Sequence, residues 1–127
     1  MSGTLQRQAK FWLLAIRPKT LFAALAPVML GTALSYSHNE GHLLNAFAAL
    51  MGAIGIQIGT NLANDYWDSK KGADTQDRLG PVRVTSSGLL SPRSVFIAMI
   101  LAFVAAGFAG LYLIYVAGWP VFWIGVL

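Results

Sequence analysis

One polar stretch follows a long apolar run in this chain and reads Asn61-Leu-Ala-Asn-Asp-Tyr-Trp-Asp-Ser-Lys-Lys-Gly-Ala-Asp-Thr-Gln-Asp-Arg-Leu-Gly-Pro-Val-Arg83. It holds four of the five acidic residues of the chain, all between positions 65 and 77. Carboxylates at the end of an apolar segment are costly unless they face a polar cavity, pair with cations or bind a metal. The stretch is therefore predicted to be a functional site. The apolar segments around it are predicted to be its scaffold.

The composition of the whole chain is typical of a membrane protein. Of the 127 residues, 56% are hydrophobic and only 11% are charged, and none is cysteine. The missing cysteines exclude disulfides and thiolate metal sites. The net charge is +4, but the basic residues flank apolar runs instead of forming a stripe with aromatic residues between them. This arrangement favours the lipid bilayer as a partner, and no nucleic acid is expected.

Hydropathy predicts an all-α fold, a polytopic membrane helical bundle. Residues 1–19 carry four basic residues around a short apolar patch and are predicted to form an interfacial helix. Apolar length predicts three complete transmembrane helices and the start of a fourth, at 20–36, 43–69, 95–118 and 120–127. These residues are expected to be the N-terminal part of one longer membrane domain.

The basic residues predict the orientation in the membrane. Four precede the first transmembrane helix, none lies in the turn at 37–42, and five lie between residues 70 and 93. Because lysine and arginine are enriched on the cytoplasmic side, the N-terminus and the 70–94 loop are predicted to be cytoplasmic, with the chain in the plasma (inner) membrane. His38 and His42 have metal-ligand spacing, but a solvated turn is expected since no carboxylate cluster surrounds them.

The 43–69 helix is predicted to have two distinct faces. A stripe of small residues allows a neighbouring membrane helix to approach closely, and one face carries such a stripe, formed by Ala48, Gly52, Gly55 and Gly59. The opposite face is polar, and at 3.6 residues per turn its members fall within about 100° of one another: Gln57, Asn61, Asn64, Asp65 and Asp68. This polar face is predicted to line a cavity, and a solvated helix end is the alternative.

Gly72 is predicted to end this helix in a left-handed conformation, with Lys70 and Lys71 in its last turn. In an unbroken helix Asp74 would point away from Asp65. Asp74 and Asp77 can therefore join the site only because the helix ends. The 70–94 loop that follows is predicted to complete the site.

This set of residues favours chemistry on a diphosphate. Asp65 and Asp68 lie one helical turn apart and suit Mg²⁺, which takes one or two carboxylates and completes its shell with water and phosphate oxygens. The basic residues that suit the phosphates are Lys71, Arg78 and Arg83. Bound Mg²⁺ makes diphosphate a good leaving group, and a polyprenyl tail fits between apolar helices. The predicted reaction is prenyl transfer.

The sequence also resembles a known family. Asn64-Asp-Tyr-Trp-Asp68 is similar to the start of the first aspartate motif of the intramembrane aromatic prenyltransferases, the UbiA superfamily. One branch, the 1,4-dihydroxy-2-naphthoate polyprenyltransferases of menaquinone biosynthesis, is the most similar, in Arg17-Pro-Lys-Thr-Leu21, Gln57, Asn61-Leu-Ala-Asn-Asp-Tyr66, Lys71-Gly72, Asp74, Asp77-Arg78 and Gly80-Pro-Val-Arg83.

The resemblance implies a nine-helix bundle, a Mg²⁺-bound polyprenyl diphosphate, and attack by the naphthoate ring with loss of its carboxylate to give demethylmenaquinone. It implies that Asp65 and Asp68 are catalytic metal ligands, that Asn64 and Asn61 are polar supports, and that Lys71, Arg78 and Arg83 bind diphosphate. Asn61 and Gln57, on the polar face, are further candidates for binding diphosphate. The third aspartate of the superfamily motif falls where this chain has Gly72, so Asp74 and Asp77 are additional candidate ligands.

Three alternatives remain open at this point. The acceptor can be another aromatic quinone precursor, such as 4-hydroxybenzoate or homogentisate. In a different class, a fragment of a divalent-cation transporter also carries Asn and Asp on a membrane helix, although the basic set repels cations. A membrane anchor without activity is the third. Because the family's second aspartate motif is expected beyond Leu127, residues 1–127 alone are expected to be inactive.

Overall fold

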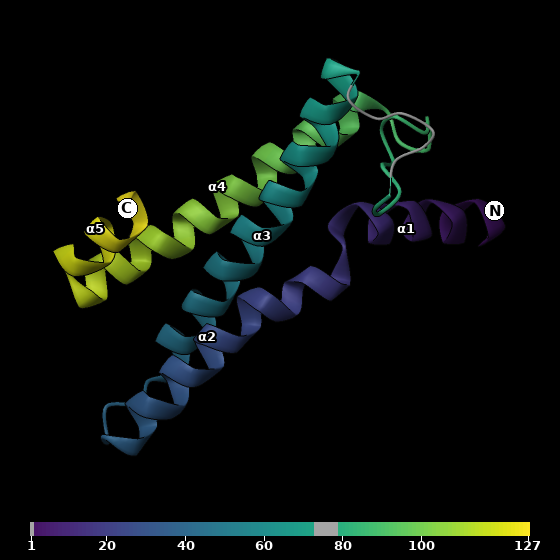
Figure 1. Cartoon of the computed structure of the whole chain (residues 1–127). Helices are drawn as coiled ribbons and strands as arrows, with labels where there is room; N and C mark the ends of the chain where they lie inside the picture. Colours follow the sequence, from purple (N-terminus) through teal and green to yellow (C-terminus); the bar gives the residue numbers. More distant parts are fainter. Residues whose placement is uncertain (1, 73–78) are drawn as a thin grey trace.

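The computed structural model describes residues 2–72 and 79–127, and this described part is helical with no strand (Figure 1). The helices are α1 (Ser2–Ile16), α2 (Pro18–Ser37), α3 (Leu43–Lys71), α4 (Pro92–Ala117) and α5 (Trp119–Val126). Three of them, α2, α3 and α4, are long and apolar enough to cross a membrane. The predicted all-α membrane bundle is confirmed.

Prolines and a left-handed corner set the helix boundaries. Pro18 opens α2 directly after Arg17, which has a φ of 56°, so α2 begins two residues before the expected Thr20. Pro92 opens α4 three residues before the expected Val95, and the Ser91 side chain caps it by accepting a hydrogen bond from the Ser94 amide at 3.2 Å. Proline is favoured in the first turn of a helix because its missing N–H has no partner there. The pairs Arg17-Pro18 and Ser91-Pro92 are therefore helix starts.

The end of α3 follows the expected chemistry. Gly72 has a φ of 62° and follows Lys71, and its amide donates to the Ser69 carbonyl at 3.4 Å. A residue without a Cβ adopts this left-handed conformation without strain. Lys70 and Lys71 occupy the last turn, where positive charge interacts favourably with the helix dipole.

The small-residue face of α3 packs against α4, which runs beside it in the opposite direction (Figure 1). A Cβ on Gly55 would lie 3.0 Å from both the Ala102 carbonyl oxygen and the Ala106 Cβ. A Cβ on Gly59 would lie 2.7 Å from the Phe103 ring. The prediction that this stripe admits a neighbouring helix is confirmed. α2 lies along α3 as well, whereas α1 turns away from α2 at Arg17.

A small core joins α1, α3, α4 and the segment before α4 at one end of the bundle. Its buried members are Ala15, Leu62, Val84, Leu90, Val95 and Met99. Val84 is completely buried although no helix contains it. The residues just before α4 are thus anchored to the same end of α3 that carries the aspartates.

Candidate functional site

Asp65 is the most deeply placed charged residue of the polar face. Its side chain lies on α3 and is 2% exposed. The Thr85 backbone amide donates to Asp65 Oδ2 at 3.0 Å, and the Thr85 hydroxyl donates to the same oxygen at 2.5 Å. A buried carboxylate is tolerated when hydrogen bonds replace its hydration. Thr85 supplies two of these bonds from a different part of the chain.

Asp68 lies one helical turn further along α3 and pairs with a cation. Arg83 Nη2 forms an ion pair with Asp68 Oδ2. Asp68 is 31% exposed, whereas Arg83 is 9% exposed. The guanidinium therefore lies inside the site and the carboxylate lies at its edge. An arginine at such a position can bind either a carboxylate or a phosphate through its planar donor group.

A tight turn places Arg83 and Thr85 beside α3. The Ser87 amide donates to the Arg83 carbonyl at 3.0 Å, and the Leu89 amide donates to the Val84 carbonyl at 2.9 Å. Gly88, with a φ of 71°, lets the chain reverse there. Buried Val84 anchors the turn in the core. The residues before and after the buried Val84 therefore each contact one aspartate: Arg83 contacts Asp68, and Thr85 contacts Asp65.

Asn61 links α3 to the corner between α1 and α2. Its Nδ2 donates to the Ile16 carbonyl and to Thr20 Oγ1, both at 2.8 Å. Thr20 Oγ1 in turn donates to the Arg17 carbonyl at 2.9 Å. Asn61 therefore fixes the corner between α1 and α2 to α3, and its amide hydrogens are used. Its predicted contact with diphosphate is not tested by these bonds, and Oδ1 is the atom left for that role.

The remaining predicted residues differ in exposure. Asn64 and Lys71 are exposed and Gln57 is half-buried. Asp74, Asp77 and Arg78 lie outside the described residues. Within the described part of the chain, no cluster of three or more His, Cys, Asp or Glu side chains is present. The described acidic site is thus the pair Asp65 and Asp68.

The residue types of this pair are ones that could hold a Mg²⁺ ion. Mg²⁺ is commonly held by one or two carboxylates, with water and phosphate oxygens completing its octahedron. Both Thr85 bonds go to Oδ2 of Asp65, so Oδ1 remains for a cation. Asp68 is accessible at the edge, beside Arg83. A cation and a phosphate can therefore be held side by side here.

Sequence reasoning missed Thr85 and Thr20. Neither residue is charged, and each is far in sequence from the aspartate or asparagine that it contacts, 20 and 41 residues away respectively. The sequence signal available for Thr85 was its place two residues after Arg83, in a polar turn before Ser91-Pro92. That signal predicts a turn, but it does not predict that Thr85 contacts Asp65.

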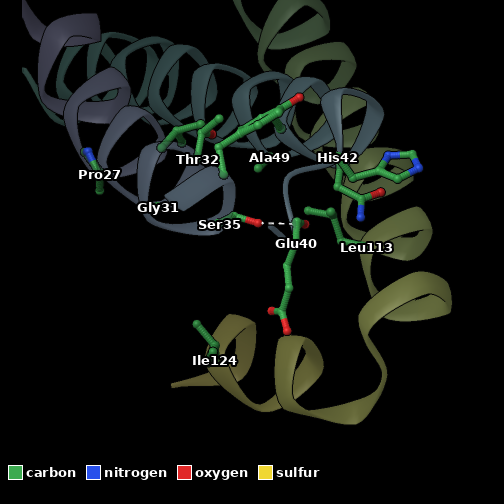
Figure 2. Close-up of a pocket in the computed structure, with 13 residues that line it drawn as sticks. Pro27, Gly31, Thr32, Ser35, Glu40, His42, Ala49, Leu113 and Ile124 are labelled. Atoms are coloured by element: carbon green, nitrogen blue, oxygen red, sulfur yellow. Dashed lines mark hydrogen bonds between the residues drawn. The ribbon is translucent and has the colours of Figure 1, made fainter. Parts of the chain in front are cut away.

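A cavity of about 600 Å³ lies at the opposite end of the bundle (Figure 2). The second half of α2, the turn after it and the start of α3 form most of its wall, and Leu113 and Ile124 complete it. Ser35 Oγ donates to the Glu40 carbonyl at 2.9 Å within it. It is separate from the aspartates, which lie at the other end of α3.

Several characterised proteins are similar to this chain. The 1,4-dihydroxy-2-naphthoate octaprenyltransferase of Escherichia coli is 42% identical over 106 residues, covering 84% of this chain and 34% of that protein. The enzyme of the same name from Mycobacterium tuberculosis is 41% identical over 102 residues, covering 80% and 35%. The one from Bacillus subtilis is 33% identical over 111 residues, covering 87% and 36%.

The chain thus spans about a third of the length of these relatives. No solved structure shows significant similarity to it. The UbiA prenyltransferase family matches residues 24–127, which contain α3, the aspartate pair and the Thr85 turn. Together with the acidic pair at the end of an apolar helix, this match shows that the chain belongs to the UbiA prenyltransferase family.

Proposed function

We propose that the complete protein containing this chain transfers a polyprenyl group from polyprenyl diphosphate to 1,4-dihydroxy-2-naphthoate, with loss of CO₂, giving the hydroquinone form of demethylmenaquinone. The observation that carries the proposal is the pairing of two α3 carboxylates with Thr85 and Arg83 at the end of an apolar helix. The acceptor is supported by the relatives, which are named as 1,4-dihydroxy-2-naphthoate octaprenyltransferases.

The reaction breaks the bond between the first prenyl carbon and the diphosphate oxygen, and the diphosphate keeps the electron pair. The naphthoate ring carbon then bonds to the prenyl carbon, and the ring carboxylate leaves as CO₂. Mg²⁺, when bound, neutralises the charge on the departing diphosphate. Asp65 and Asp68 would hold that ion, and Asn64 would support them.

The basic and polar groups around the pair are proposed to bind the diphosphate. Arg83 already lies beside Asp68, so a phosphate that reaches this edge meets both a cation site and a guanidinium. Lys71 is exposed at the end of α3 and can add a third charge. Gln57, Asn61 and Arg78 complete the proposed set, and Asp74 and Asp77 are proposed as further ligands.

The acidic end of the bundle is proposed to face the cytoplasm, in the plasma membrane. The basic residues of α1 support this orientation, since Arg7 and Lys10 are exposed on a helix that turns away from α2. α1 would then lie at the membrane surface, with its charges among lipid headgroups. The prenyl tail would extend from the aspartates along the apolar helices.

The test is an assay of the complete protein in membranes with radiolabelled polyprenyl diphosphate and Mg²⁺. Parallel reactions receive dihydroxynaphthoate, 4-hydroxybenzoate or homogentisate, each with and without EDTA. We expect prenylated naphthoquinol that disappears with EDTA. Transfer to another acceptor alone would replace the naphthoate assignment, and EDTA-resistant transfer would remove the metal from the proposal.

Two further arms address the alternatives. Residues 1–127 alone are proposed not to catalyse transfer, since the family's second aspartate motif is not among them, and product from this chain would contradict that. A divalent-cation transporter is disfavoured because the buried Arg83 guanidinium, paired with Asp68, repels cations and suits phosphates. Metal flux into vesicles containing the complete protein would favour it instead.

A further inference from the structure

Thr85 uses both of its hydrogen-bond donors on one oxygen atom of Asp65. The backbone amide and the hydroxyl both reach Oδ2, at 3.0 and 2.5 Å. A carboxylate oxygen has two lone pairs in the carboxylate plane, and two donors fill them. Oδ1 receives neither of these bonds. The two oxygens of Asp65 are therefore placed in different environments by a single residue.

The position of Thr85 is itself fixed. Val84 before it is completely buried, and Leu90 after it is 6% exposed in the same core. The Gly88 amide donates to the Thr85 carbonyl at 3.1 Å, so the peptide on that side is held in the turn. The Thr85 amide is left to point out of the turn, toward α3. Thr85 thus reaches Asp65 from an anchored backbone and not from a mobile segment.

A purely structural role for this contact makes a different prediction. If Thr85 only replaced the hydration of a buried carboxylate, removing its hydroxyl would lower the stability of the protein and leave metal affinity unchanged. The backbone amide would still donate its one hydrogen bond. If it orients the carboxylate, losing the hydroxyl frees the carboxylate to rotate. Groups that hold a metal-binding carboxylate in place commonly change metal affinity by about 10- to 100-fold when they are removed.

We propose that Thr85 is a positioning residue for Asp65, which holds Oδ2 with two donors so that Oδ1 is presented to a divalent cation. The proposal rests on the proposed function, because it takes Asp65 as a metal ligand. It adds a residue from the turn before α4 to a site otherwise formed by α3. The chemical feature it requires at position 85 is a hydroxyl, and the methyl group is not needed.

The test measures Mn²⁺ binding to the purified complete protein by electron paramagnetic resonance, with inorganic diphosphate present. Thr85→Val keeps the side-chain shape and removes the hydroxyl, and we expect its Mn²⁺ dissociation constant to rise about 10- to 100-fold. Thr85→Ser restores the hydroxyl, and we expect affinity close to that of the unsubstituted protein. Thr60→Val is the matched control, because Thr60 is exposed on α3. We expect it to bind Mn²⁺ normally.

Each outcome decides something. Normal Mn²⁺ affinity in Thr85→Val, or equal losses in Thr85→Ser and Thr85→Val, would overturn the positioning role. If Thr85→Val does not fold, Thr85→Ala takes its place, and a serine variant no better than the alanine variant overturns the proposal. Asp65→Asn separates the two levels of inference. If Asp65→Asn binds Mn²⁺ normally, Asp65 is not a metal ligand and that part of the proposed function is wrong. If Asp65→Asn loses Mn²⁺ binding but Thr85→Val binds normally, only the proposed role of Thr85 is wrong.

Discussion

At the scale of single residues, the site depends on two hydrogen-bonded side chains of α3 that look alike in the sequence and act differently in the structure. Asp65 accepts hydrogen bonds from Thr85, whereas Asn61 donates hydrogen bonds to Ile16 and Thr20. Their polar character was predictable from helical periodicity. Which partner each would take was not, because those partners lie at least 20 residues away along the chain.

Asp65→Asn in the complete protein is expected to reduce prenyl transfer by more than about a hundredfold. This exceeds the loss of about 10- to 100-fold that is usual when a residue that holds a metal ligand is removed. The reason is that the amide keeps a hydrogen-bond acceptor for Thr85 but loses the charge that a cation needs. Immunoblots of isolated membranes serve as the control, and the variant is expected there in normal amount. Disappearance of the protein from the membrane would show that Asp65 serves folding.

Asn61→Ala is expected to lower the free energy of unfolding by about 1–3 kcal/mol, because the Ile16 carbonyl and the Thr20 hydroxyl lose a buried partner. Thermal unfolding in detergent measures the change. Asn64→Ala is the matched control, since Asn64 is exposed on the same helix, and a small change is expected. Equal losses in both variants would mean that the corner does not depend on Asn61.

At the scale of helices, the packing of α3 on α4 was the most predictable feature. The stripe of small residues predicted which face of α3 a neighbouring helix would contact. The structure places Gly55 on that face, against Ala102 and Ala106 of α4. Helix starts were less predictable, since Ser91-Pro92 and Arg17-Pro18 read as interruptions although each proline opens a helix. The sequence shows a proline in either case, and only its structural surroundings show whether it begins a helix or interrupts one.

Gly55→Leu is expected to separate α3 from α4 and to lower the free energy of unfolding by about 1–3 kcal/mol, because the added side chain overfills a close contact. Gly52→Ala is the control, since its Cβ would meet Ala109 at 3.7 Å, an ordinary contact distance. Thermal unfolding of the complete protein in detergent compares the two. A Gly55→Leu variant as stable as Gly52→Ala would contradict the packing of α3 on α4.

At the scale of the whole molecule, exposed apolar side chains cover α2, α4 and α5. Phe22, Leu101 and Trp123 are 70%, 62% and 61% exposed. Such surfaces are stable against lipid or against further helices of a membrane domain. The polar groups instead gather at the two ends, with the aspartates at one end and the turn after α2 at the other.

The proposed orientation can be tested with introduced thiols, because the chain contains no cysteine. The substitution His38→Cys introduces a thiol in the turn after α2, and Ser87→Cys introduces one in the exposed part of the Thr85 turn. In a background without other cysteines, a membrane-impermeant maleimide is expected to label position 38 on intact cells. Position 87 should react only after the membrane is opened. The reverse pattern would place the aspartates outside the cell.

The distance along the chain between Asp65 and Thr85 has a consequence for biosynthesis. Thr85 is made 20 residues after Asp65. At the usual pace of about 5–20 residues per second, the ribosome needs roughly 1–4 s to cover that interval. Thr85 therefore leaves the ribosome about 1–4 s after Asp65, and in that interval the Asp65 carboxylate has not met its donors. Water or the insertion machinery must solvate that charge until the turn arrives. A pause in translation after Asp65 has left the ribosome and before Thr85 has left it should therefore prolong the time that Asp65 spends without its donors.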